Sequence, residues 1–142
     1  MLIPHVVSTE ADKVFVNVLN NQTVALSDGD AVVWNITTPD GVRTKQAATA
    51  TLSLFVGVAD GSIAASAYGL AQAYGYKSAA LVTNDTSQAV AAGNILIPVN
   101  GADYLDYSAA SDGKTGFVYA AEAFATDSTP AAATKGVFIR AL

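Results

Sequence analysis

The sequence predicts an all-β protein with little or no helix, whose strands form a barrel or a sandwich. Short apolar runs with period-two alternation recur along the 142 residues, as half-buried strands require. Clusters of Gly, Asn, Asp and Pro separate these runs at positions where tight turns are expected. Small residues occupy one side of the central runs, which is typical of strands that pack closely.

The central stretch covers residues 52–82 and contains the clearest strand patterns. We expect a first strand over residues 52–58, where Leu and Val alternate with Ser, Phe and Gly. A turn follows at residues 59–62. A second extended run covers residues 68–76 and continues through residues 77–82.

Shorter segments on both sides complete the predicted sheet. Residues 42–50 are expected to be polar and exposed, and residues 101–116 to form a polar connection with a turn. The alanine-rich residues 120–133 are interrupted by polar residues and Pro130, so a long helix is not expected there. The further strands are predicted at residues 13–19, 31–36, 95–99, 117–122 and 137–142, with turns at 20–22, 27–30, 37–41 and 83–87.

An internal similarity predicts two related half-units around one shared core. Residues 23–35 and 88–99 both have an apolar lead-in, a turn glycine (Gly29, Gly93), a polar residue and a hydrophobic strand. In the same order, residues 55–60 correspond to 117–122 and residues 68–73 to 135–140. A chance match of common turn–strand patterns is the alternative explanation.

Length and composition predict one β domain over residues 13–142, preceded by an arm at residues 1–12. The net charge of −5 argues against nucleic-acid binding, and no apolar run is long enough to cross a membrane as a helix. Without cysteine the chain has no disulfide or thiolate site. Only 13% of the residues are charged. Either part of the surface is buried against other copies or a partner, or the surface is rich in Ser, Thr and Asn.

The sequence offers no combination of residues that predicts an enzyme, a metal site or a bound cofactor. His5 is the only histidine and lies in the arm, where a catalytic triad would lack support. Asp28-Gly29-Asp30 is interpreted as a tight turn rather than a calcium ligand set. Asp103 and Asp106 are interpreted as surface-loop residues rather than as a glycosidase pair.

Four aromatic residues allow a binding or a packing role. Trp34 lies among apolar residues, and core packing is favoured over ligand stacking. Tyr68, Tyr74 and Tyr76 are candidates for a subunit interface, because tyrosine is enriched at interfaces. Ordinary packing in the core and at its rim explains the three tyrosines equally well.

The order of elements over residues 23–99 resembles that of the small head-decoration (cement) proteins of tailed bacteriophages. The resemblance rests on the segments around Gly29 and Gly93, on Phe55-Val56-Gly57-Val58-Ala59 and on residues 68–75. It implies a compact β-barrel or β-tulip that forms a homotrimer on the outer surface of the expanded head. There it would stabilise contacts between major capsid subunits, without a cofactor. The arm residues expected to contact the capsid are Leu2, Ile3, Pro4, His5, Val6 and Val7. The alternative is a carbohydrate- or receptor-binding β-module of a phage or bacterial surface structure, with Trp34 or the tyrosines exposed.

Overall fold

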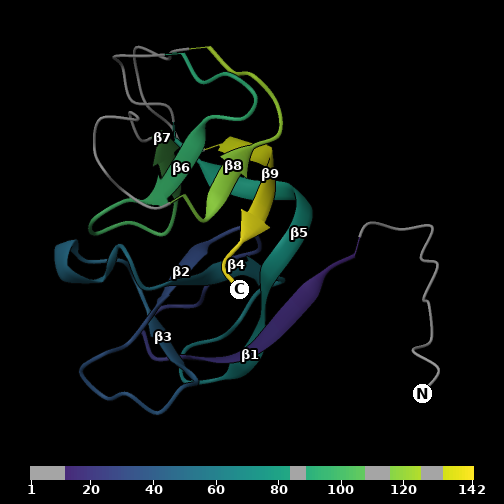
Figure 1. Ribbon diagram of the computed structural model, residues 1–142. Coiled ribbons are helices and arrows are strands. Elements are labelled where there is room, and N and C mark those ends of the chain that lie inside the picture. The colour runs from purple at the N-terminus through teal and green to yellow at the C-terminus, as the bar shows by residue number, and fades with distance from the viewer. Residues whose placement is uncertain (1–11, 84–88, 108–115, 126–132) are drawn as a thin grey trace, which may run out of the picture.

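The computed structural model describes residues 12–83, 89–107, 116–125 and 133–142, and this part of the chain is all-β. Its only helical element is η1, a single 3₁₀ turn at Thr49–Thr51. The prediction of an all-β fold with little or no helix is therefore confirmed (Figure 1). The strands are β1 (Val14–Asn20), β2 (Ala31–Trp34), β3 (Arg43–Lys45), β4 (Phe55–Asp60), β5 (Tyr68–Val82), β6 (Ile95–Pro98), β7 (Leu105–Tyr107), β8 (Val118–Ala120) and β9 (Ala133–Arg140).

All the strands belong to one sheet, and two series of pairings both return to β5. The first series runs β1–β3–β2–β4–β5, and β5 also pairs with β1. The second runs β5–β7–β6–β8–β9, and β9 also pairs with β5. Figure 1 shows β5 passing from one group of strands to the other. At Tyr74 this strand pairs with Val14 on one side and with Arg140 on the other.

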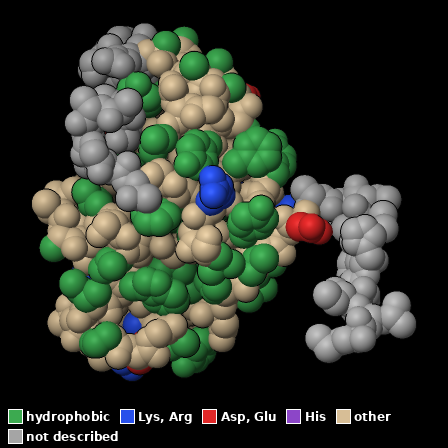
Figure 2. All heavy atoms as spheres, in the orientation of Figure 1, with side chains coloured by type: hydrophobic (Ala, Val, Ile, Leu, Met, Phe, Trp, Pro, Cys, Tyr) green, Lys and Arg blue, Asp and Glu red, His purple; other side chains and the backbone are tan. Residues whose placement is uncertain are grey.

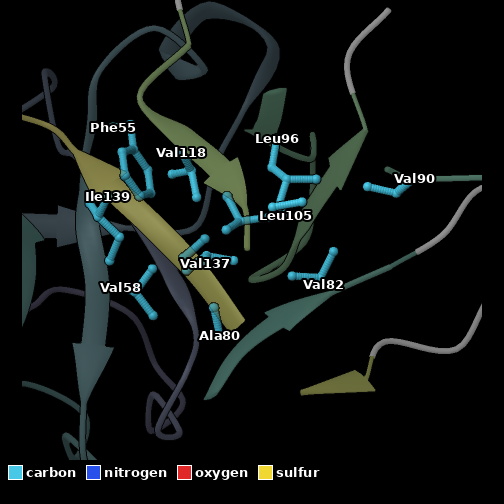
Figure 3. Close-up of a cluster of buried hydrophobic side chains, with 12 residues drawn as sticks. Phe55, Val58, Ala80, Val82, Val90, Leu96, Leu105, Val118, Val137 and Ile139 are labelled. Atoms are coloured by element: carbon cyan, nitrogen blue, oxygen red, sulfur yellow. The ribbon is translucent and has the colours of Figure 1, made fainter. Parts of the chain in front are cut away.

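Two clusters of buried hydrophobic side chains fill these two groups, and β4 contributes to both. Val56 and Ala59 belong to the smaller cluster, with Val18, Leu26, Val32, Ile63 and Ala71. Phe55 and Val58 belong to the larger cluster, where they lie near Ile139 and Val118 (Figure 3). Residues 55–59 of β4 are all buried, whereas the alternation at residues 52–58 is typical of a strand with only one buried face. The strand lies between two cores, so side chains on both of its faces are covered.

The predicted turn at residues 27–30 is present and is closed by its own side chain. Gly29 has φ +94°, a conformation that L residues rarely adopt. The backbone N–H of Ser27 donates to Asp30 Oδ2 at 2.7 Å, and the N–H of Asp30 donates to the Ser27 carbonyl at 3.2 Å. Two further bonds join the turn to β4: Gly29 N–H donates to the Ala59 carbonyl, and Ala59 N–H donates to the Asp30 carbonyl.

The turn at residues 91–94 has the same set of hydrogen bonds. Gly93 has φ +87°, Asn94 Oδ1 accepts from Ala91 N–H at 2.8 Å, and Asn94 N–H donates to the Ala91 carbonyl at 3.0 Å. Gly93 N–H donates to the Ala120 carbonyl, and Ala120 N–H donates to the Asn94 carbonyl. In these bonds Ala120 takes the place of Ala59. The sequence comparison instead aligned Ala59 with Ala121, one residue further along the chain.

Two segments predicted to be polar and irregular are strands instead. Thr44 is fully buried and its Oγ1 donates to the Leu19 carbonyl at 3.2 Å, so residues 42–50 are not simply exposed. Leu105 is also fully buried and pairs in parallel with Val82, which makes β7 part of the predicted 101–116 connection. Both strands are only three residues long and include polar residues, so they lack the apolar run from which the other strands were predicted.

Candidate interaction surface

The outer sides of β1, β5 and β9 carry exposed apolar side chains, which we call the aromatic face. The exposed fractions are 63% for Tyr68, 43% for Tyr74, 37% for Tyr76 and 51% for Phe138. Figure 2 shows hydrophobic side chains gathered on the viewed side of the molecule, where Figure 1 places these strands. The members of the aromatic face are Val14, Phe15, Tyr68, Leu70, Tyr74, Tyr76 and Phe138.

Tyr76 and Phe138 form an aromatic pair at one end of this face. They are directly opposite each other in the β5–β9 pairing, and their ring centroids are 5.4 Å apart at an interplanar angle of 54°. Such tilted cross-strand pairs are favourable for aromatic rings. A Cβ atom at Gly136 would lie 3.0 Å from Tyr76 Oη, so the glycine leaves room for the tyrosine ring.

The backbone beneath the tyrosines is fixed by a buried glutamine and a glycine. Gln72 Nε2 donates to the carbonyls of Tyr74 and Tyr76, both at 3.1 Å. Gly75 has φ +97°, and the backbone of Asp12 passes so close that a Cβ at this position would clash with the Asp12 carbonyl oxygen. The two tyrosines are therefore held on a defined backbone rather than on a loop.

Two hollows meet at Phe138 and Arg140. One, of about 450 Å³, extends to Tyr74, Tyr76 and Asp12. The other, of about 390 Å³, extends over Tyr119 and the small residues Ala92, Gly93, Ala120 and Ala121. Aromatic and apolar surface with a cation and a carboxylate at its margin is the composition of a protein contact surface. The arrangement can bind an apolar segment or a matching face.

A polar cluster joins the two groups of strands near β5. The Nζ of the buried Lys77 lies 2.9 Å from Asp28 Oδ1 and 3.0 Å from Asp60 Oδ1. Burial alone would lower the pKa of Lys77, but its hydrogen bonds to the two carboxylates outweigh burial and the pKa is raised. The pKa of Asp28 is lowered, first by the hydrogen bond from Gly61 N–H and then by Lys77. Each acidic group is engaged by the lysine, which indicates a structural role.

Burial raises the pKa of Asp30, and the nearby carboxylates of Asp103 and Asp28 add to this effect. Asp103 accepts hydrogen bonds from the side chains of Gln22 and Gln46, and Asp106 lies in β7 rather than in a loop. These hydrogen bonds give the Asp103 carboxylate a structural role. Among the described residues, no group of three or more His, Cys, Asp or Glu side chains could hold a metal ion.

The structure brings Tyr74 and Tyr76 together with Phe138, while Tyr68 lies at the start of β5, opposite Leu19. The sequence prediction did not include Phe138, Phe15 or Arg140. Phe138 is exposed between the buried Val137 and Ile139, as the alternation of side chains along a strand requires. This alternation could have predicted from the sequence that Phe138 faces outward. Trp34 packs against the smaller core cluster but is only partly buried. The arm residues Leu2, Ile3, Pro4, His5, Val6 and Val7 lie outside the described residues.

No helix within the described ranges is long and apolar enough to span a membrane. No family model matches the sequence. A search of the curated proteins finds no significant match. The function is therefore inferred from the residues and from the surface they form.

Proposed function

We propose that this protein is a bacteriophage capsid decoration (cement) protein without catalytic activity or cofactor. It binds the outer surface of the expanded icosahedral head and stabilises contacts between major capsid subunits. The observation that carries the proposal is the aromatic face, in which Tyr74, Tyr76 and Phe138 are exposed on paired strands and can form the contact between copies of the homotrimer that the resemblance implies. Exposed aromatic clusters of this kind mark protein contact surfaces. The resemblance around Gly29 and Gly93 supports the same function.

The fold we propose is a compact β-barrel or β-tulip made of two related half-units that share β5. Two features support it. Both series of strand pairings return to β5. The turns at Gly29 and Gly93 have corresponding hydrogen bonds, and the backbone bridge between Leu26 and Ile63 has a counterpart between Val90 and Phe124.

In this proposal the aromatic face is the contact between copies in a homotrimer. Tyr68, Tyr74 and Tyr76 would be covered by a neighbouring copy, and the 13% of charged residues in the chain agrees with a partly covered surface. Asp12 and Arg140 line the same hollow. Opposite charges at the margin of an apolar surface can fix the orientation of two copies.

The N-terminal arm is assigned to the major capsid protein. Its proposed contact residues, Leu2 to Val7, are mostly apolar. Asp12, the first described residue, lines a hollow of the aromatic face, so the arm is attached beside the proposed contact between copies. A protein that binds only the assembled shell stabilises that shell by mass action, and many copies add their contributions.

The test is co-sedimentation of the purified protein with expanded heads that lack it, with copies counted per major capsid subunit. Saturable binding near one copy per subunit is expected. Deletion of residues 1–12 should weaken head binding while far-UV circular dichroism stays unchanged. A wild-type protein that does not bind expanded heads, or a truncated protein that binds with unchanged affinity, would contradict the corresponding part of the proposal.

A second pair of variants tests the aromatic face separately. Combined Tyr76→Ser and Phe138→Ser substitutions should shift the protein from trimer to monomer in sedimentation velocity. The matched control is Val24→Ser, because Val24 is 58% exposed and is not part of the face. A trimer that persists in the double variant would show that copies meet elsewhere.

A further inference from the structure

A third hollow, of about 190 Å³, lies beside the connection between β2 and β3. It is lined by Trp34, Asn35, Ile36, Pro39, Gly41 and Arg43. None of these residues belongs to the aromatic face or to the Lys77 cluster. Trp34 contacts the smaller core cluster and also lines the hollow, so the indole is held in place by the fold.

The connection that builds this hollow is longer than strand pairing requires. Trp34 and Thr44 are paired in β2 and β3, and the nine residues 35–43 join them. Pro98 and Leu105 are paired in the same antiparallel way in β6 and β7, and the six residues 99–104 are enough to join them. The connection at 35–43 is thus three residues longer, and five of its nine residues line the hollow.

Two of the residues that line the hollow, Asn35 and Arg43, carry hydrogen-bond donors. Asn35 is more than nine-tenths buried as a residue, and its Oδ1 accepts from Thr37 N–H at 3.0 Å. Within the described part of the chain its Nδ2 has no acceptor, which is costly for a buried amide unless a ligand supplies one. The Nη1 of Arg43 lies 3.1 Å from Asp40 Oδ2. The guanidinium has five N–H donors and keeps others for a ligand.

Asp40 holds the Arg43 guanidinium in place and makes the binding of an anionic ligand unfavourable. Its Oδ1 accepts from the backbone N–H groups of Arg43 and Val42, and these bonds lower the pKa of Asp40. The carboxylate therefore stays ionised at neutral pH and neutralises Arg43. With a net chain charge of −5 in addition, an acidic ligand is disfavoured.

We propose that this hollow binds one neutral pyranose ring of a glycan. The flat indole of Trp34 suits the C–H face of a sugar, while ring and hydroxyl oxygens accept from Asn35 and Arg43. Pockets for drug-sized ligands measure roughly 300–1,000 Å³, so a hollow of about 190 Å³ suits a single ring. The site is independent of the proposed attachment to a capsid.

Trp34 is the only tryptophan, so its fluorescence reports directly on this site. The full chain, free of heads, is titrated with the methyl glycosides of glucose, galactose, mannose and N-acetylglucosamine. At least one glycoside should change the Trp34 emission saturably. Arg43→Met keeps the aliphatic stem but removes the donors, and should weaken binding about tenfold, as the loss of one hydrogen bond to a charged group implies.

A second variant and its matched control distinguish a local effect on the hollow from a loss of folded protein. Ile36→Thr keeps the β-branched shape but makes the wall of the hollow polar, and should also weaken binding. Val24→Thr makes the same kind of change at an exposed position that does not line the hollow, and should bind as the wild type does.

Two outcomes would overturn the proposal. One is the absence of a saturable change with all four glycosides; in that case saturation by a proline-rich peptide would assign the hollow to peptide recognition. The other is an unchanged affinity in both Arg43→Met and Ile36→Thr.

Discussion

The turns at Gly29 and Gly93 have the same hydrogen bonds, so the same substitution in each turn can be compared. The difference in unfolding free energy between the two variants measures how tightly the Gly29 turn packs against β5. Gly29→Ala and Gly93→Ala both place a Cβ on a backbone with positive φ, +94° and +87° respectively. They differ in their surroundings. A Cβ at position 29 would lie 2.8 Å from the Ala79 carbonyl oxygen in β5, whereas one at position 93 meets nothing within 4 Å.

The expected magnitudes follow from these surroundings. An L residue in left-handed backbone costs about 1–2 kcal/mol, and the stiffer unfolded chain offsets about 0.4–1 kcal/mol of this. Gly93→Ala should therefore lower the free energy of unfolding by about 1 kcal/mol. Gly29→Ala must also displace backbone, and overpacking of this kind adds about 1–3 kcal/mol. We expect a total loss of about 2–4 kcal/mol.

The assay is urea unfolding of both variants and of the wild type, followed by Trp34 fluorescence and by far-UV circular dichroism. The slope with denaturant should stay constant, so that a change in midpoint reports stability. Equal losses in the two variants would refute the reasoning. They would show that the turn at Gly29 is not pressed against β5, and that only the φ cost is being measured.

The remaining predictions concern the core and two aspartates. Leu26→Ala removes a buried side chain and should cost about 2–5 kcal/mol of unfolding free energy, while the exposed Val24→Ala should stay within about 0.5 kcal/mol. Because the folded-state pKa of Asp28 is below the ordinary 3.8, its stabilisation is present above that pH and is lost as the pH falls through the folded pKa. Asp28→Asn should therefore lower the Tm at pH 7 and have little effect in strong acid; a Tm difference that is the same at both pH values would contradict this. The pKa of Asp30 is shifted the opposite way, so ionisation destabilises the fold as the pH rises through the folded pKa. Asp30→Asn, which copies Asn94 of the other turn, should raise the Tm at pH 7 and lose that advantage below about pH 3.8; a lower Tm at pH 7 would count against buried charge as the dominant effect.

Much of the fold could be predicted from local patterns. Apolar runs located β1, β2, β4, β5, β6, β8 and β9, although β4 begins three residues later and ends two residues later than the predicted strand at 52–58, and the turn residues located the bends at Gly29 and Gly93. The pairing of strands distant in the sequence could not be predicted, because it depends on contacts such as Val82 with Leu105 that no local pattern encodes. Strands β3 (Arg-Thr-Lys) and β7 (Leu-Asp-Tyr) were missed because each is short and has polar residues, whereas the equally short β8 lies in an apolar run.

The interaction surface was predicted only in part. Tyrosine is enriched at interfaces, and this preference pointed to Tyr68, Tyr74 and Tyr76, all of which are exposed. Phe138 lies in the last predicted strand, for which no exposed face was predicted. Its exposure is set by the register Tyr76–Phe138, and a shift of one residue would have placed it inside. The Trp34 hollow depends on the conformation of residues 35–43, which the sequence showed only as a turn.

The shared strand β5 also determines how the protein can unfold. Both series of pairings include this strand, and its fifteen residues pass from one core to the other without a linker. If one group of strands opened, β5 would lose partners along half its length and the second core would lose part of its wall. Opening of either group therefore disrupts both cores, and we expect the chain to unfold as a single cooperative unit rather than as two independent parts.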